Sequence, residues 1–339
     1  MHILQEEVAL SVIVCYHVGD LLQRCLDSVR KSEQIKYEII VVSSIPAIQV
    51  GEDVLLIHSV EGPAYKRNLA SRFARGKYLV FLDDDVTISP YTLYHLWQFM
   101  ERHKKTGIGF AKIFKMTRRN IFDDCGSFLL YNGFIWSRAG NEIEDKGQYD
   151  SPCMIFSSKS ATCIARRSSF LDVGGFDSSY YILGEESDLS FRMWLKGYEV
   201  WYIPEARSWH AFGCEEIKPT KEFYNISRIH RNGSRNYIQM LLTNVGTFRL
   251  SFMLPLHLFG WLLAIIFFCL KGQLNRAFLI ILGFFDVLRT IPNILKKRKK
   301  IQDSRVISDK DLFEIILKKP PKGYFRERLL RYVIRGRHG

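Results

Sequence analysis

The chain has 339 residues and a mass of 39.6 kDa, which suggests two domains, or one α/β domain with an extension. Hydrophobic residues make up 47% and charged residues 24%, which allows a large core and excludes a wholly disordered chain. Lysine and arginine exceed the acids by 48 to 35, and the last 51 residues hold 16 basic and 5 acidic residues, a local charge of about +11. This basic end suits an anionic partner, either a membrane surface or nucleic acid.

Apolar runs alternate with helical stretches through the first part of the chain. Such alternation predicts an α/β fold with a mostly parallel sheet flanked by helices. Beyond residue 107 the pattern weakens, and we expect short strands and loops as far as 165. The expected strands are 8–16, 37–42, 54–58, 77–82 and 198–203, and the expected helices are 21–29, 63–75, 89–104 and 186–196.

Two apolar stretches follow residue 250. Residues 252–270 contain no charged side chain over 19 residues, which approaches the ~20 needed to span a bilayer. The second stretch, 277–291, is shorter and includes Asp286 and Arg289, and KKRKK follows at 296–300. A single span would place the basic end outside, against the positive-inside rule. A two-span hairpin, a re-entrant or interfacial helix pair, and a buried soluble helix or single span stay open, and we favour the interfacial pair because it tolerates the short second arm.

Three consecutive acids end the strand expected at 77–82, where residues 81–85 read FLDDD. Like charges at the end of a buried strand repel each other, and a divalent cation removes that cost. Carboxylates together with a substrate diphosphate are a common way to hold Mg²⁺ or Mn²⁺. Ligands of open α/β sheets also bind at the carboxyl ends of strands. The alternative is a solvated acidic turn that caps the next helix.

A second acidic group, GEESDLSFR at 184–192, follows a glycine-rich turn, VGGFD at 173–177. Glu185 and Asp188 would share a helix face, although acids at a helix start also complement the helix dipole. His210 follows the strand expected at 198–203, and a lone histidine is more often packed in a core than bound to a metal.

Taken together and in order, these segments resemble the family 2 inverting glycosyltransferases of the GT-A fold. The resemblance covers about 10–212 and implies a nucleotide-diphospho-sugar transferase fold. The segments that carry it are LSVIVCY at 10–16, EIIVVS at 38–43, GPAYKRNLA at 62–70, FLDDD at 81–85, ARR at 165–167, VGGFD at 173–177, GEESDLSFR at 184–192, GY at 197–198 and IPEA at 203–206, with His210 after them.

The resemblance implies a role for each matched position. Asp83 and Asp85 correspond to the acids that meet the nucleotide ribose and the metal, and His210 to the histidine that completes the metal site in several members. The implied cofactor is Mn²⁺ or Mg²⁺. The nucleotide sugar is expected to meet residues of the same site, which are Tyr16, Ser43, Lys66, Arg67, Asp83 and Asp84.

Three acids are candidates for catalysis: Glu185, Glu186 and Asp188. Glu185 and Glu186 align with the family's acidic pair, whose second member is the catalytic base. We expect Glu185 to orient a sugar and Asp188 to pair with Arg192 four residues later. Two departures from the family pattern stand out. The second strand ends in Ser43 where an aspartate usually contacts the nucleobase, and Glu186 is one methylene longer than the usual aspartate.

A closer resemblance is to rhamnosyltransferase-like members of surface-glycan assembly. It rests on the GGFD block and on YNISRIHRN at 224–232. The QxxRW motif of processive synthases is absent, so one sugar per acceptor is expected. The implied function is transfer of a sugar from a nucleotide-diphosphate donor to a lipid-linked glycan or polysaccharide precursor. A polyprenyl-phosphate sugar synthase and a non-catalytic module that binds membranes or partners are the alternatives.

The expected location is the cytoplasmic face of the cell membrane. Seven cysteines cannot all pair and none forms a CxxC motif, which favours a reduced compartment, and the first seven residues do not resemble a signal peptide. The basic end lacks a recognised nucleic-acid module, so an anionic membrane is the expected partner and nucleic acid is not. The expected regions are a GT-A domain at 1–212, a helical linker at 213–250, the apolar helix pair at 251–291 and the basic tail at 292–339.

Overall fold

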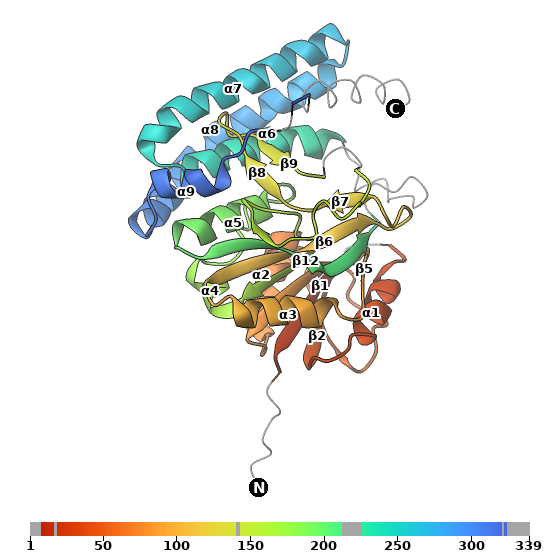
Figure 1. Cartoon of the computed structure of the whole chain (residues 1–339). Coiled ribbons are helices and arrows are strands. Elements are labelled where there is room, and N and C mark those ends of the chain that lie inside the picture. Colours follow the sequence, from red (N-terminus) through yellow and green to blue (C-terminus); the bar gives the residue numbers. More distant parts are fainter. Residues whose placement is uncertain (1–7, 17–18, 140–142, 212–225, 321, 324–339) are drawn as a thin grey trace.

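The computed structural model of the chain describes all residues except 1–7, 17–18, 140–142, 212–225, 321 and 324–339 (Figure 1). The start of the segment at 224–232 and the basic residues beyond 323 therefore lie outside the described residues.

The described chain forms one mixed sheet with helices on both faces and a layer of long helices at one end (Figure 1). The main sheet has the order β10-β12-β6-β11-β4-β1-β2-β3, while β5 pairs with β12, β7 pairs with β6, and β8 and β9 pair separately. The strands are β1 (Leu10–Tyr16), β2 (Tyr37–Ser43), β3 (Val54–His58), β4 (Tyr78–Asp83), β5 (Val86–Ile88), β6 (Thr106–Lys115), β7 (Phe122–Asp124), β8 (Ser127–Leu129), β9 (Ile135–Ser137), β10 (Cys153–Met154), β11 (Thr162–Arg166) and β12 (Glu199–His210).

The expected α/β architecture is confirmed. Strands β1 to β4 are mutually parallel, and β6 is parallel to β12, while β11 runs antiparallel between β4 and β6. The helices are α1 (Leu22–Arg30), α2 (Pro63–Phe73), α3 (Thr92–Arg102), α4 (Arg167–Asp172), α5 (Glu185–Leu195), α6 (Ile226–Asn244), α7 (Thr247–Leu270), α8 (Leu274–Asp303) and α9 (Asp309–Ile316).

Both faces of the sheet are buried, which explains why its strands read as continuous apolar runs rather than as alternating patterns. Ile13 and Phe81 belong to the core on the side of α2 and α5. Val12 and Val80, their neighbours in sequence, belong to the core on the side of α1 and α3. Successive side chains of a strand point to opposite faces, so each strand contributes to both cores.

The expectation of only short strands and loops at 107–165 is wrong for β6, a ten-residue strand inside the sheet. Two glycines and a lysine interrupt its apolar pattern. A Cβ at Gly109 would lie 2.5 Å from Ile203 Cδ1 of the adjacent β12, so any larger residue there would force that side chain to move. The lysine, Lys112, is fully buried and forms ion pairs with Asp145 at 3.0 Å and with Asp150.

The strand expected at 198–203 continues to His210 as β12. The register of β12 against β6 shifts between Ile203 and Arg207, and Pro204 lies within this irregularity. A bulge accommodates a proline that a regular ladder would exclude. The extension carries His210 to the strand end where β5 begins.

The helices α6 to α9 pack on the sheet domain and on one another. On α7, His257 is fully buried and its Nδ1 lies 3.0 Å from the carbonyl oxygen of Asn132. On α8, Lys297 donates to both carboxylate oxygens of Asp177, at 2.7 and 2.6 Å. Helix α9 buries Phe313 against Phe191 of α5. The helices are therefore attached to the sheet domain by polar and apolar contacts.

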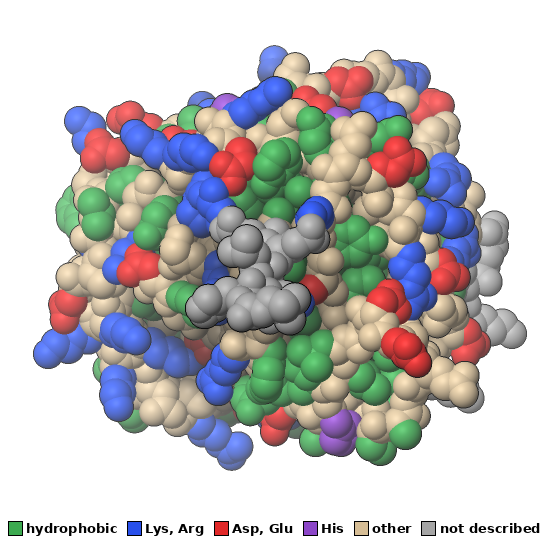
Figure 2. All heavy atoms as spheres, turned by 90° about the horizontal axis from the view of Figure 1, so that it is seen from below, with side chains coloured by type: hydrophobic (Ala, Val, Ile, Leu, Met, Phe, Trp, Pro, Cys, Tyr) green, Lys and Arg blue, Asp and Glu red, His purple; other side chains and the backbone are tan. Residues whose placement is uncertain are grey.

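The two apolar stretches form a helix hairpin, α7 and α8, which lies across one end of the molecule (Figure 1). By length and composition both helices are capable of crossing a membrane. Many of their exposed apolar side chains are spaced three, four or seven residues apart, which places these side chains on one side of each helix. We call these exposed side chains the apolar face: Phe248, Phe252, Leu256, Phe259, Leu263, Ile266 and Leu270 of α7, with Phe278, Phe285, Leu288 and Leu295 of α8. Figure 2 shows the opposite end of the molecule, where charged side chains of both signs are spread among the others.

Gly283 lies where α8 crosses α6, and its missing side chain allows the two helices to pack closely. A Cβ added at Gly283 would lie 2.0 Å from Ser234 Oγ and 2.6 Å from the carbonyl oxygen of Arg231. Because α6 and α8 would have to move apart, we expect Gly283→Ala to lower the free energy of unfolding by about 2 kcal/mol, measured by denaturant titration.

Gly233→Ala on α6 is the matched control. The added Cβ there would meet Trp261 at 3.8 Å, an ordinary van der Waals contact. Alanine also has the higher helix propensity, so this substitution should be neutral or slightly stabilising. Equal losses from the two substitutions would contradict the close crossing of α6 and α8.

Candidate active site

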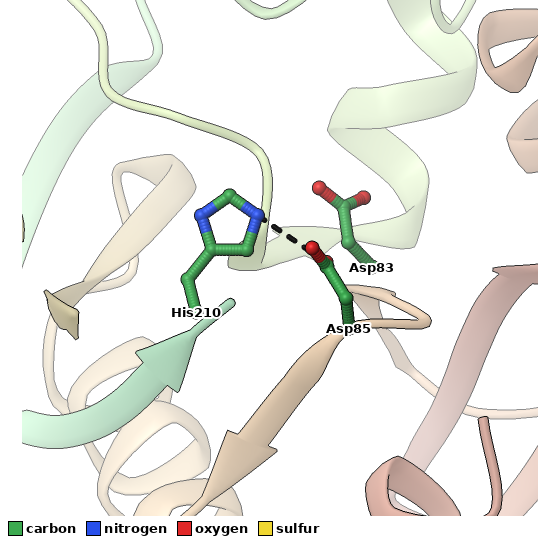
Figure 3. A group of neighbouring side chains, drawn as sticks. All are labelled: Asp83, Asp85 and His210. Atoms are coloured by element: carbon green, nitrogen blue, oxygen red, sulfur yellow. Dashed lines mark ion pairs between the residues drawn. The ribbon is translucent and has the colours of Figure 1, made fainter. Parts of the chain in front are cut away.

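Asp83, Asp85 and His210 meet at one edge of the main sheet (Figure 3). Asp83 is the last residue of β4, and Asp85 precedes β5, which pairs antiparallel with the end of β12. This pairing brings His210 Nε2 to 3.3 Å from Asp85 Oδ1. One ligand atom from each of the three residues lies within 4.8 Å of the others.

This cluster fits a divalent cation. Two of its three side chains are carboxylates, the ligands that Mg²⁺ and Mn²⁺ prefer, and the third is an imidazole. All three come from strand ends or from the turn between strands, which fixes their separation. The structure therefore brings together Asp83, Asp85 and His210, the residues expected to bind a metal, and Asp84 lies in the same turn.

His210 is held from behind by an acidic residue. Its Nδ1 lies 2.9 Å from Asp123 Oδ2 of β7, and Lys159 donates to the other oxygen of Asp123 at 2.6 Å. Burial disfavours the imidazolium, but Asp85 and Asp123 outweigh it and raise the pKa of His210 to about 10. Asp85 and Asp123 supply negative charge that would favour a bound cation, and Nε2 must lose its proton before it can bind a metal. The bond to Asp123 places a proton on Nδ1 and directs Nε2 at the cluster.

Arg67 of α2 connects the acidic cluster to the start of α5. Its guanidinium is buried and donates to Asp83 Oδ1 at 2.8 Å and to Glu185 Oε1 at 3.3 Å. It also lies over the ring of Phe176, 5.2 Å from the centroid. Burial opposes its charge, but Asp83 and Glu185 raise the pKa of Arg67 above its usual value. Arg67 thus remains a cation shared by two carboxylates.

The expected nucleotide-binding residues lie at the carboxyl ends of β1 and β2 and on α2. Tyr16 and Ser43 are register partners at the ends of β1 and β2. Lys66 donates to the carbonyl oxygen of Tyr16 at 2.9 Å and to the hydroxyl of Ser44 at 2.5 Å. The hydroxyl of Ser43 instead donates to the carbonyl oxygen of Ile45 at 2.7 Å, so it is occupied within its own turn.

The two glutamates begin α5 beside Arg67. Gly184, the residue before the helix, has φ +87°, and Leu183 has φ +71°, a conformation that non-glycine residues rarely adopt. Glu185 is buried and bound to Arg67, whereas Glu186 is only partly buried. Burial, and then the neighbouring Glu185, raise the pKa of Glu186 well above its usual range. A carboxylate with a raised pKa is a stronger base.

Asp188 faces away from the cluster and into the core. It accepts a hydrogen bond from Arg192 Nε at 2.9 Å and one from Asn244 of α6 at 2.9 Å, and its ion pair with Arg192 Nη2 measures 2.7 Å. Arg192 also donates to the carbonyl oxygens of Val173 and Gly175, both at 2.7 Å. The expected pairing of Asp188 with Arg192 is present, and it ties α5 to the glycine-rich turn and to α6.

Three residues of the site were not found from the sequence. Asp123 and Lys159 hold His210, and Asn236 of α6 donates to the carbonyl oxygens of Ile182 and Leu183 at 2.9 and 2.7 Å. None of them lies in a recognisable motif. The adjacent acids at 123 and 124 were the only sequence signal, and their partners are far away in the chain.

We expect Asp123 to control metal affinity through His210. Replacing it with asparagine removes the negative charge that orients the imidazole and supports its basicity, so the dissociation constant for Mn²⁺ should rise about 10–100-fold. Titration of Mn²⁺ followed by electron paramagnetic resonance measures this. Asp172→Asn is the control, because Asp172 is an exposed carboxylate that pairs with Lys196 at 3.3 Å. Unchanged affinity in Asp123→Asn would exclude the orienting role.

A comparison with curated proteins gives no match. Among solved structures, GalNAc-T7 with UDP, GalNAc and Mn²⁺ is 16% identical with a TM-score of 0.54, over 70% of this chain and 48% of that one. The chain thus spans about half the length of that structure. Mannosyltransferase PcManGT from Pyrobaculum calidifontis, in complex with GDP-Man and Mn²⁺, is 14% identical with a TM-score of 0.51, over 88% of this chain and 86% of that one.

These likenesses establish the fold. The sequence model described as Glycosyl transferase family 2 matches residues 11–163, which include β1, β2, α2 and the acids that end β4. The chain therefore has the GT-A fold, and its residues 11–163 are similar to the family 2 glycosyltransferases.

Proposed function

We propose that the protein is a metal-dependent, inverting hexosyltransferase that moves one sugar from a nucleotide diphosphate to a lipid-linked glycan or polysaccharide precursor. The observation that carries the proposal is the metal-binding geometry of Asp83, Asp85 and His210, which Arg67 joins to the acidic start of α5. Solved structures of the same fold that contain Mn²⁺ with UDP or GDP-Man support the donor class.

Asp83, Asp85 and His210 would hold Mn²⁺ or Mg²⁺, which offsets the charge of a leaving diphosphate. Lys66 and Tyr16 lie at the neighbouring end of the sheet, where a nucleotide would be placed beside the metal cluster. Ser43 has its hydroxyl occupied, so we infer that backbone groups at the end of β2, rather than this side chain, meet the nucleobase.

Glu186 is the proposed general base. In an inverting displacement the acceptor hydroxyl attacks the anomeric carbon from the side opposite the diphosphate, and a carboxylate must take its proton. Glu186 is the more exposed of the two glutamates, while Arg67 keeps Glu185 engaged. Glu185 would then orient the donor sugar through its fixed position. The rhamnosyl-like specificity and the role in surface-glycan assembly remain sequence-based predictions.

The proposed location is the cytoplasmic face of a membrane, with the apolar face of α7 and α8 in the bilayer interface. The inner side of α7 buries Met253 and His257 against the protein, which supports an interfacial rather than a spanning arrangement. The run at 296–300 contributes less charge than its composition suggests. Lys297 pairs with Asp177, and Arg298 donates to the carbonyl oxygens of Leu242 and Val245.

The proposal is tested by release of sugar from UDP-, GDP- and dTDP-sugars. Activity should disappear with EDTA and return with Mn²⁺ or Mg²⁺. Within this assay Glu186→Gln should lower kcat about 10²–10⁴-fold, with donor affinity nearly unchanged, because only proton removal is lost. Full activity in EDTA would exclude the metal-dependent mechanism, and absence of any donor turnover would favour the non-catalytic alternative.

Asp188→Asn is the matched variant in the same assay. It leaves the buried Arg192 without a charged partner, so we expect the free energy of unfolding to fall by about 3 kcal/mol. The effect of this substitution on kcat should be smaller than that of Glu186→Gln. A folded, inactive Asp188→Asn together with an active Glu186→Gln would show that Asp188 is the base.

Membrane binding is tested by point substitutions, because deletion of the helices would also remove α9 from the core. Phe259 and Leu263 of α7 are 57% and 51% exposed. Phe259→Glu combined with Leu263→Glu places two charges in the apolar face, and we expect vesicle binding in a flotation assay to fall at least tenfold. Tyr91→Glu, a change at an exposed residue 41% accessible on the sheet domain, should leave binding intact. Equal effects of the two changes would exclude the apolar face as the membrane contact.

A further inference from the structure

An open cavity of about 470 Å³ lies between α6, α8 and the loop that leads into α5. Its lining includes three arginines and one carboxylate, so its charge is positive. Concave sites with convergent polar groups are where small ligands bind, and arginine is the residue best suited to phosphate. The lining residues that matter here are Tyr181, Arg231, Arg235, Leu279, Asp286 and Arg289.

The helix geometry directs these charges into the cavity. Arg231 and Arg235 are four residues apart on α6, and Asp286 and Arg289 are three apart on α8, so each pair shares a helix face. Arg231 binds Asp286 through two hydrogen bonds, of 2.5 and 2.7 Å. The single carboxylate of the lining is therefore hydrogen-bonded to one of the three arginines, and the charges of all three lower the pKa of Asp286.

The other two arginines, Arg235 and Arg289, could still bind an anion. Arg235 donates to the carbonyl oxygen of Ser179, but its Nε is buried and has no hydrogen-bond partner among the described residues. Arg289 is exposed and forms no ion pair within the described part of the chain. A buried N–H without a partner is costly, and the oxygen of an anion would remove that cost.

Two residues of the apolar face are sequence neighbours of cavity-lining residues on α8. Phe285 and Leu288, which precede Asp286 and Arg289 in the sequence, belong to that face and are 55% and 64% exposed. Leu279 adds an apolar wall to the cavity itself. A ligand with an anionic head and an apolar tail fits this combination, because the tail would continue onto the apolar face.

The same cavity is close to the catalytic acids. Tyr181 lies only four residues before Glu185, so their Cα atoms are at most about 14 Å apart. The intervening loop is fixed by Asn236, the neighbour of Arg235, which donates to the carbonyl oxygens of Ile182 and Leu183. A phosphate in the cavity would lie one short loop away from the acidic start of α5.

We propose that this cavity binds the phosphate or diphosphate that joins the lipid to the sugar of the acceptor. This inference rests on the proposed function and specifies its acceptor. Arg235 and Arg289 bind the phosphate oxygens, the lipid follows the apolar face, and the sugar end extends past Tyr181 toward Glu186. An anionic phospholipid of the bilayer presents the same phosphate chemistry and is distinguished by experiment.

The test uses the full-length protein in an uncharged detergent, titrated with farnesyl diphosphate and followed by calorimetry. We expect the wild-type protein to bind farnesyl diphosphate, and the affinity to fall about tenfold or more in Arg289→Gln and in Arg235→Gln. The affinity for farnesol, which has no phosphate, should be the same in the wild-type protein and in these variants. Arg276→Gln, which removes the same charge from the first turn of α8, should bind like the wild type. Arg289 is exposed, so its substitution tests the site without loss of the fold. Equal binding by all four proteins would overturn the proposal.

Vesicles of phosphatidylcholine, with or without phosphatidylglycerol, identify the source of the phosphate. We expect Arg289→Gln and Arg276→Gln to bind these vesicles equally well, because the cavity serves the acceptor. If Arg289→Gln alone loses binding to the anionic vesicles, and these vesicles displace farnesyl diphosphate, the occupant is a bilayer lipid and the acceptor assignment is wrong.

Donor binding separates failure of this inference from failure of the proposed function. Thermal stabilisation by UDP- or GDP-sugars with Mn²⁺ is measured on the wild-type protein in the same preparation. Donor stabilisation without farnesyl diphosphate binding would refute the cavity assignment alone. Absence of donor stabilisation would refute the proposed function, whatever the cavity binds.

Discussion

The site depends on one buried cation, Arg67, shared between Asp83 and Glu185. The two carboxylates come from the end of β4 and the start of α5, elements that are far apart in the chain. In a poorly solvated region the two acids would repel each other, and a guanidinium between them turns that repulsion into a fixed arrangement. Arg67 therefore sets the distance between the proposed metal site and the proposed base, and α2, which carries it, becomes part of the catalytic framework.

The helical layer is connected to this framework by polar bonds rather than by the chain alone. Asn236 holds the loop before α5, Asn244 holds Asp188 within α5, and Lys297 holds the glycine-rich turn through Asp177. The proposed membrane surface is thus attached directly to α5, which carries the proposed catalytic acids. This arrangement fits an enzyme whose acceptor arrives from the membrane, because docking and the position of the acids share the same contacts.

In the last third of the chain, some charged and apolar side chains contact the protein and others are exposed, and composition does not separate the two groups. Part of the run at 296–300 binds carboxylates and carbonyl groups of the protein, while Lys296, Lys299 and Lys300 stay exposed. In the same way α7 has one buried side and one exposed side. A hydropathy window averages over both sides of a helix, so it finds the helix but not the side that faces the protein.

The sequence by itself determined the alternation of strands and helices, the buried strands as apolar runs, and the acids at the end of β4, because these follow from local patterns. It also indicated the pairing of Asp188 with Arg192, which needs only one helix turn. The sequence did not predict β6, because its glycines and Lys112 are explained only by their contacts with β12 and with distant loops. Only the tertiary structure decided that Asp123 contacts His210, which lies 87 residues later in the chain. In the same way, only the structure showed that Arg67 joins Asp83 to Glu185, which lies 118 residues after Arg67. Such partners are chosen by the order of strands in the sheet, and no local pattern of residues records that order.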